Sequence, residues 1–317
     1  MAVKNSLSRT TEPKPRLGLA AFLNAENVLS NIDQAIGKES RQRFITSVIS
    51  SVNTNPALQE CTHQSILSAA LLGEALKLSP SPQLGHYYMV PFNDKENGKV
   101  AQFQLGYKGY IQLAIRSGQY KKLNVLAIKE GELVRFDPLN EEIEVNLIED
   151  EEQREAAPTV GYYAMFEYVN GFRKAIYWSK HKMLSHADKY SAAFSKDGCT
   201  VNTRNGQKKK VSFADYEAGN FPASDAWMYS SFWYKDFDGM AYKTMLRQLI
   251  SKWGIMSIDM IRAMDSDMAY IHEDGTNDYV ETREPYVIDA EIVEQDEKPK
   301  GDAKAALFGN QEGVKDE

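Results

Sequence analysis

Apolar residues in the first part of the chain recur every three to four positions, which is the period of an amphipathic helix. This pattern predicts helices over residues 18–36, 38–53 and about 62–77. Asn55-Pro56 ends the second helix, because the residue before a proline disfavours helical backbone angles. We therefore expect a helical part over residues 17–78.

The pattern changes after residue 84 to short runs rich in β-branched and aromatic residues, which are typical of strands. The predicted strands are 87–92, 100–105, 122–128, 160–169 and 173–178. Asn170-Gly171 between the last two is a strong signal for a hairpin turn. Helical spacing returns over 107–117 and ends at Gly118. We expect a β-rich core over residues 84–190.

Three later helices are predicted at 179–190, 237–252 and 257–269, the last two within a C-terminal helical part over residues 227–273. Residues 191–226 are rich in Ser, Gly, Asn and Lys and predict a long loop or insertion. Together these elements indicate an α+β fold, with N-terminal helices and a small, mainly antiparallel sheet against which helices pack.

Both ends of the chain have compositions that disfavour a packed structure. Residues 1–16 are polar and contain two prolines, so we expect a flexible arm, and residues 274–317 predict an acidic, largely disordered tail. No apolar run approaches the roughly 20 residues of a membrane helix. Cys61 and Cys199 lie apart from each other and from any histidine at ligand spacing, which indicates neither disulfides nor zinc. A cytoplasmic protein fits these features.

Charge is unevenly distributed along the chain, whose net charge is −7. Residues 265–317 hold 5 Lys/Arg and 16 Asp/Glu, and residues 130–155 hold 2 and 11. The remainder therefore carries a net charge of +13. A basic body suits an anionic partner, because phosphate binding depends on local potential more than on the overall pI. Taken alone, each acidic run is as consistent with a merely solvated face or a solubility tail as with this interpretation.

A stretch without any acid, residues 99–129, interleaves basic residues with tyrosines. Lys and Arg contact phosphates and aromatic rings stack on exposed bases, so this mixture is what a single-strand groove requires. The candidate DNA-binding residues here are Tyr107, Lys108, Tyr110, Arg116, Lys121, Lys122 and Lys129. The alternative is a positive surface stripe beside tyrosines that fill a core.

Two further basic sets complete the candidate DNA-binding surface. Their members are Arg173, Lys174, Lys180 and Lys182 in one set and Lys243, Arg247 and Lys252 in the other. Solvated helix faces are common, so this spacing alone favours DNA only modestly. The run Lys208–Lys210 lies in the predicted insertion and is better interpreted as a solvated loop.

Motifs for catalysis are lacking in the sequence. The Gly-Lys pairs at 37–38 and 98–99 lack the frame of a phosphate-binding P-loop, so ATP hydrolysis is not expected. The carboxylates of 141–155 form a dense run rather than spaced ligands, which disfavours a two-metal nuclease. We therefore expect no catalytic residues, no metal site and no cofactor, and a binding protein rather than an enzyme.

Three ordered blocks of sequence resemble the RecT family of phage recombinases, and the resemblance extends over about residues 40–270. The blocks are Leu84-Gly85-His86-Tyr87-Tyr88-Met89-Val90-Pro91-Phe92, Leu105-Gly106-Tyr107-Lys108-Gly109-Tyr110 with Leu113–Gly118, and Asp236-Phe237-Asp238-Gly239-Met240-Ala241-Tyr242-Lys243-Thr244 with Arg247. Two departures stand out. Lys77-Leu78-Ser79-Pro80 replaces a frequent Gly-Leu-x-Pro, and Tyr242 stands where the family often has a lysine.

The resemblance implies a fold similar in outline to the Red-beta and eukaryotic strand-annealing proteins. It also implies ATP-independent binding of single-stranded DNA and annealing of complementary strands to a duplex during homologous recombination. The implied partners are further copies of the chain in rings or helical filaments, a phage exonuclease and the host single-strand binding protein, with no membrane. The rival interpretation is a protein that coats single strands or recruits partners without annealing them.

Overall fold

The computed structural model describes residues 18–94, 97–203, 206–272 and 274–279. All of these belong to one unit of the chain, residues 1–283. The predicted N-terminal arm lies outside the described residues, as does most of the predicted acidic tail. The first residues of that tail form a strand, β11 (Asn277–Tyr279).

The N-terminal part is helical, as predicted. Its elements are α1 (Leu19–Leu23), α2 (Glu26–Ile36), α3 (Lys38–Thr54), the 3-10 helix η1 (Pro56–Glu60) and α4 (His63–Ala75). The single helix expected over 18–36 is broken at Asn24, whose side chain donates to the carbonyl of Ala20 at 2.7 Å. Asparagine favours such local bonds over a continued helix. Most of α4 is buried, since it packs between the other helices and a sheet.

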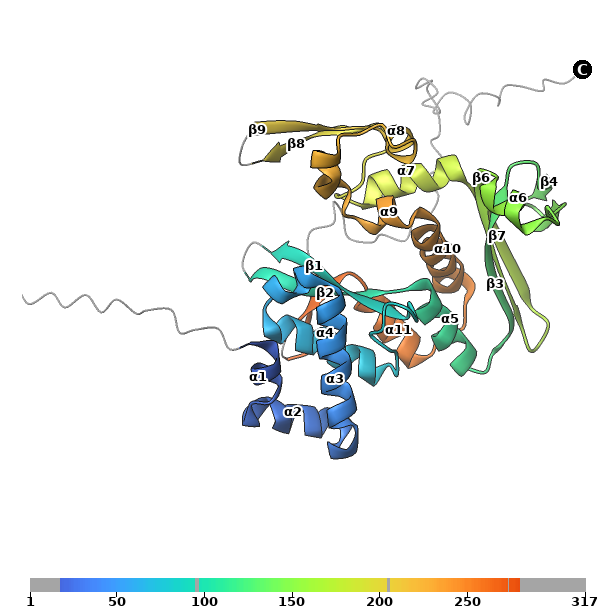
Figure 1. The fold of residues 1–317 in the computed structure, drawn as a ribbon. Helices are drawn as coiled ribbons and strands as arrows, with labels where there is room; N and C mark the ends of the chain where they lie inside the picture. Colours follow the sequence, from blue (N-terminus) through green and yellow to red (C-terminus); the bar gives the residue numbers. More distant parts are fainter. Residues whose placement is uncertain (1–17, 95–96, 204–205, 273, 280–317) are drawn as a thin grey trace, which may run out of the picture. The chain divides into compact units, whose positions relative to one another are not determined.

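The first sheet combines an early hairpin with the end of the described chain (Figure 1). Its strand order is β1-β2-β10-β11, with β1 (Tyr87–Asp94), β2 (Gly98–Leu105) and β10 (Ala269–Ile271). All pairings are antiparallel, and Ala269 pairs with Phe103. α5 (Tyr107–Arg116) and α11 (Ile258–Asp265) also contact each other.

The second sheet has the order β3-β6-β7, again antiparallel, with β3 (Tyr120–Lys129), β6 (Thr159–Tyr168) and β7 (Arg173–Ser179). The predicted hairpin turn is present, and Gly171 adopts a left-handed φ of 88°. Successive strand residues face opposite sides. One side packs against α7 (Lys180–Tyr190) and α10 (Phe237–Trp253), and the other carries a small apolar cluster with the hairpin β4 (Leu133–Asp137) and β5 (Glu142–Val145).

The segment predicted as a long loop, 191–226, contains regular structure. It holds the hairpin β8 (Cys199–Thr203) and β9 (Gly206–Lys210), the helix α8 (Phe213–Glu217) and the start of the 3-10 helix η2 (Ala223–Tyr229). α9 (Phe232–Lys235) follows. Aromatic residues anchor the segment in the second core, where the ring of Phe213 lies 4.9 Å from that of Phe237. The polar composition of the segment gave no indication of this aromatic packing.

These elements confirm the α+β class. The dense acidic run also contains structure, since β5 is followed by the short helix α6 (Glu151–Ala156), whose N-terminus is capped by Asp150. Among the described residues, no helix is long and apolar enough to span a membrane. The same residues contain no cluster of three His, Cys, Asp or Glu side chains that could hold a metal ion.

Candidate nucleic-acid interface

The first two of the three sequence blocks meet at the N-terminus of α5. A Cβ atom on Gly106 would lie 2.2 Å from the carbonyl oxygen of Gly85, and one on Gly109 would lie 2.1 Å from that of His86. The Gly106 N–H donates to the His86 carbonyl at 2.9 Å. Only glycine allows backbones to approach this closely. These glycines therefore fix α5 against the start of β1.

Fixing α5 sets the direction of its exposed side chains. Lys108 and Arg116 are both exposed and lie on the same side, as their eight-residue spacing predicts. Burial lowers the pKa of His86, and the charges of Arg116 and Lys108 lower it further. The Arg116 guanidinium also donates to the carbonyl of Leu76 at 2.7 Å, at the C-terminus of α4. Both cations therefore lie near His86.

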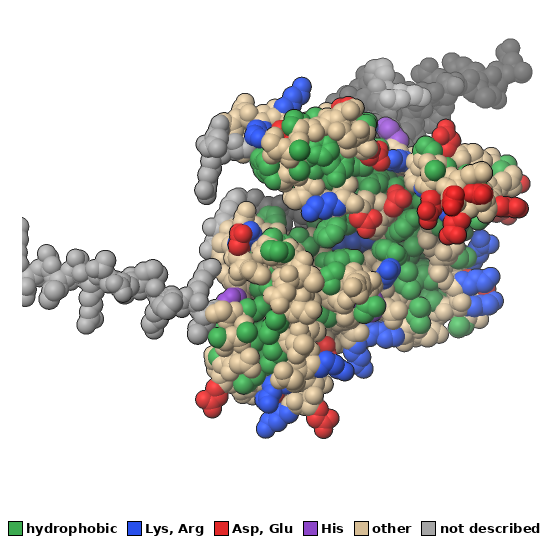
Figure 2. All heavy atoms as spheres, in the orientation of Figure 1, with side chains coloured by type: hydrophobic (Ala, Val, Ile, Leu, Met, Phe, Trp, Pro, Cys, Tyr) green, Lys and Arg blue, Asp and Glu red, His purple; other side chains and the backbone are tan. Residues whose placement is uncertain are grey.

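An open hollow of about 590 Å³ lies beside α5, on the face of the second sheet that also carries β4 and β5. Three of its lining residues, Lys121, Lys122 and Arg173, are candidate DNA-binding residues. The rest of the lining is Ile111, Ile115, Tyr120, Leu123, Asn124, Tyr163 and Met165. We call this the basic hollow. Figure 2 shows Lys and Arg side chains gathered at the side of the molecule where Figure 1 places β3 and β7.

The cations of the basic hollow share one carboxylate. Lys121 Nζ lies 2.6 Å and Lys122 Nζ 3.7 Å from the carboxylate oxygens of Glu167. The hydrogen bond from Lys121 lowers the pKa of Glu167, and the charges of both lysines and Arg173 act in the same direction. Because both lysines are largely exposed, solvent screens these pairs. The lysines can therefore exchange Glu167 for a phosphate at small cost.

The tyrosines of the candidate set occupy different environments. Tyr110 is fully buried, in agreement with the alternative of a core residue. Tyr107 is half-buried, and its ring meets that of Tyr242 edge-on at 5.5 Å. Tyr120, which the candidate set omitted, lines the basic hollow and donates from its hydroxyl to the Ile255 carbonyl at 3.0 Å.

Side chains along β7 point alternately to opposite faces of the sheet, and this divides the second basic set. Arg173 faces the basic hollow, whereas Lys174 points to the other side, pairs with Glu141 and lies 4.2 Å from the ring centroid of Trp253. Lys180 pairs with Glu217 at 3.0 Å. Lys182 is exposed and lies 4.5 Å from the Trp178 ring. Only Arg173 of this set lines the hollow.

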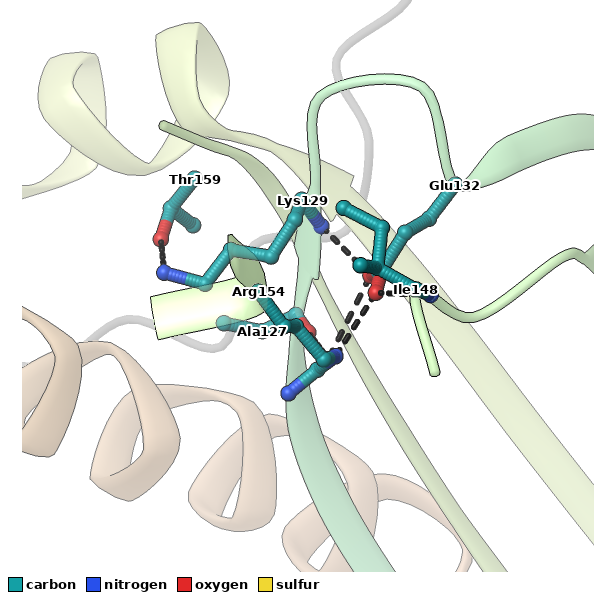
Figure 3. A network of polar contacts seen from close by, with 6 residues as sticks. All are labelled: Ala127, Lys129, Glu132, Ile148, Arg154 and Thr159. Carbon is teal, nitrogen blue, oxygen red and sulfur yellow. Dashed lines mark hydrogen bonds and ion pairs between the residues drawn. The ribbon is translucent and has the colours of Figure 1, made fainter. Parts of the chain in front are cut away.

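Lys129 belongs to a polar network at the far end of β3 (Figure 3). Its ammonium group donates to Thr159 Oγ1 at 3.2 Å, and its backbone N–H donates to Glu132 at 2.8 Å. The Glu132 side chain is fully buried and accepts two hydrogen bonds from Arg154, at 2.6 and 3.3 Å. Burial opposes ionisation, but the hydrogen bonds outweigh it and lower the pKa of Glu132. The network attaches the acidic segment to β3.

Two members of the third basic set, Lys243 and Arg247, turn inward. Lys243 Nζ and Arg247 Nη1 each lie 2.8 Å from a different oxygen of Asp267, whose side chain is fully buried. Asp267 also accepts from the Leu105 N–H at 2.9 Å. Burial lowers the pKa of Lys243, and Asp267 opposes that shift. Lys243 is buried with its counterion, whereas Lys252 is exposed.

Comparison with known proteins identifies the family. The model of the RecT family matches residues 42–287, most of the chain. The chain belongs to the RecT family. The uncharacterised protein YqaK of Bacillus subtilis is 34% identical to it over 326 residues, which cover 100% of this chain and 96% of YqaK. Protein RecT of Escherichia coli is 31% identical over 156 residues, covering 48% of this chain and 56% of RecT.

Membership of the RecT family supports a role in DNA recombination and annealing, and it implies binding of single-stranded DNA and oligomerisation. Proteins of this family are annealing proteins and are not known as hydrolases.

Several residues that line the basic hollow of this RecT-family chain were not predicted as site residues from the sequence. Asn124, Tyr163 and Met165 line it, yet they carry no charge and lie within runs predicted only as strands. The available signal was the two-residue alternation of β3 and β6, which places these side chains on one face. Ile111 and Ile115 of α5 also line it, and Ile115 is 59% exposed.

Proposed function

We propose that this chain binds single-stranded DNA in the basic hollow and anneals it to a complementary strand without ATP. The observation that carries this proposal is the convergence of Lys121, Lys122 and Arg173 on one open sheet face. Two of these residues lie in the acid-free stretch and the third begins β7, more than forty residues later. Folding thus brings together cations from segments that lie far apart in the sequence.

The hollow has the composition that single-strand binding needs. Its cations would neutralise phosphates, and the half-buried Tyr120 provides an aromatic ring beside them. Lys108 and Arg116 on the exposed side of α5 extend the positive surface. Bases held by their phosphates keep their pairing edges open, so the complementary strand supplies the sequence specificity.

Homology cannot be tested on the few bases that one hollow accommodates. We propose that copies of the chain line up in a ring or filament so that the hollows form a continuous track. The partners that this activity calls for are a phage exonuclease and the host single-strand binding protein. The exonuclease produces the single strand, and the annealing protein displaces the host protein from it.

The deciding experiment measures annealing of two labelled complementary oligonucleotides without nucleotide cofactor. Wild type is compared with Lys121→Gln/Lys122→Gln, and with Lys38→Gln/Arg43→Gln, which removes two exposed charges from α3. The proposal predicts that wild type and the α3 variant anneal the strands, whereas the hollow variant binds and anneals weakly. If wild type binds single strands but never accelerates their pairing, the protein is a coating or adaptor protein instead.

A further inference from the structure

Exposed apolar side chains gather at the end of the second sheet where β6 turns into β7. Six of the twelve large apolar side chains that are exposed among the described residues belong to this group. They are Val169 and Phe172 at the turn, Trp253 and Ile255 at the end of α10, and Ile258 and Ile261 on α11. We call these six residues the turn-end patch. Single exposed apolar residues are common on proteins, whereas such a group marks a binding surface.

Contacts between the segments hold the turn-end patch together. The Tyr168 ring stacks on that of Phe172 at 5.8 Å, and its hydroxyl donates to the Trp253 carbonyl at 3.1 Å. The Tyr120 hydroxyl donates to the Ile255 carbonyl at 3.0 Å. Because Tyr120 also lines the basic hollow, the turn-end patch borders that hollow.

The surroundings of the turn-end patch are mainly basic. Lys252 and Arg262 are exposed beside it, and Asp259 is the single acid in the sequence between them. Lys121 and Arg173 of the basic hollow add positive charge at the same end of the sheet. A partner with exposed carboxylates therefore has complementary charge here.

The opposite end of the second sheet carries the reverse charge. There β3 leads into residues 130–155, which hold 11 acids against 2 basic residues. Figure 2 shows acidic side chains gathered where Figure 1 places β4 and α6. Val134 and Leu147 are exposed in the same segment. We call Val134, Leu147 and the exposed acids of residues 149–155 the acidic end.

We propose that the turn-end patch of one copy of the chain binds the acidic end of a second copy. Apolar contact at the centre with complementary charge around it is the composition of a specific interface. The occupant is another copy because membership of the RecT family implies oligomerisation and because the chain itself carries the complementary surface. Since the two surfaces differ, the contact is head-to-tail and repeats, which closes a ring or extends a filament.

Such a contact joins the two ends of one sheet, so the basic hollows of successive copies follow one another along the assembly. This inference rests on the proposed function, which requires a continuous track of hollows. It adds the surfaces that form the track.

The test is mass photometry of the full-length protein without DNA. A turn-end variant, Ile258→Glu/Ile261→Glu, is compared with an acidic-end variant, Leu147→Lys/Glu151→Lys. The control is Trp227→Glu, which adds a charge at an exposed apolar position outside both surfaces. We expect wild type and the control to form assemblies of several copies, and each interface variant alone to be monomeric. An equimolar mixture of the two interface variants should form dimers and nothing larger, because one intact pair of surfaces remains.

Four outcomes would overturn this inference. A monomeric wild type, or interface variants that assemble like wild type, would remove these surfaces from the contact between copies. Dimers of the acidic-end variant alone would show that the turn-end patch pairs with itself, and a mixture that stays monomeric would show that the two surfaces do not bind each other.

Two controls keep these outcomes interpretable. Ile258→Glu alone changes a side chain that is 84% exposed, so it repeats the test if the double variant does not fold. Assembly is measured without DNA, and single-strand binding is measured separately on Lys121→Gln/Lys122→Gln. Failure of the basic hollow is therefore distinguishable from failure of the contact between copies.

Discussion

The carboxylate of Asp267 lies 2.8 Å from the ammonium group of Lys243, and both residues are buried. Asp267 precedes β10, whereas Lys243 lies on α10, and the same carboxylate holds Arg247 and the Leu105 N–H. The pair of like charges on α10 therefore has a counterion inside the protein. It therefore ties α10 to β2 of the first sheet.

Replacing Asp267 by Asn should therefore destabilise the fold. Removal of one partner of a buried ion pair costs about 3–5 kcal/mol, because the remaining cations stay buried without compensation. Chemical denaturation should show this loss, with DNA affinity preserved in the folded fraction. An unchanged denaturation midpoint with weakened DNA binding would instead favour a direct DNA contact by Lys243 and Arg247.

DNA binding near α5 should depend on pH through His86. Its pKa lies below the ordinary 6.5 because of burial, Arg116 and Lys108, so the folded protein binds fewer protons than the unfolded chain. Stability from this group is present above about pH 6.5 and is lost as the pH falls below it. A phosphate between Lys108 and Arg116 would raise the pKa of His86. Single-strand affinity should then increase from pH 7.5 to 6 in wild type, and this increase should be absent from His86→Gln.

Tyr107 and Tyr110 should respond differently to alanine. Tyr110 is fully buried, so Tyr110→Ala should lower the free energy of unfolding by about 3–5 kcal/mol. Tyr107 is half-buried, and Tyr107→Ala should cost less stability while weakening single-strand binding by about 1–3 kcal/mol if a base stacks on it. Thermal unfolding and fluorescence anisotropy separate the two effects. Tyr107→Ala with full DNA affinity would assign Tyr107 to packing alone.

The acidic tail should oppose DNA binding or serve a partner. Most of residues 265–317, with 16 acids against 5 basic residues, lies outside the described structure. A tethered acidic chain has a high effective concentration near the protein's own cations. Truncation after Thr282 should therefore preserve or increase single-strand affinity at low salt. A truncated protein that stays folded and oligomeric but no longer binds DNA would contradict this account.

The elements with strong periodicity were predictable from sequence, and those held by tertiary contacts were not. The hairpin at Asn170-Gly171 and helices α4 and α10 follow from apolar spacing and turn chemistry. The strands β4, β5, β8 and β9 lie in charged or polar segments, where neighbouring contacts stabilise them rather than their own apolar pattern. Strand propensity is a weak guide for segments whose stability depends on such contacts.

Only part of the candidate site was predictable, because the sequence shows which residues are charged but not which residues they pair with. Lys121, Lys122 and Arg173 meet in the basic hollow, and Lys108 and Arg116 share the exposed side of α5. Lys243 carries the same charge in an equally acid-free stretch, yet its counterion lies 24 residues away in Asp267. No local pattern distinguishes these cases, since the distinction depends on how distant segments pack.

The most direct test of the basic hollow is the salt dependence of single-strand binding. Wild type and Lys121→Gln/Lys122→Gln/Arg173→Gln would be titrated with a labelled oligonucleotide over a range of salt concentrations. Each lost phosphate contact lowers the log–log slope by about 0.7, so the triple variant should have a slope smaller by about 2. A triple variant that remains folded and retains the wild-type slope would show that the strand does not lie in the basic hollow.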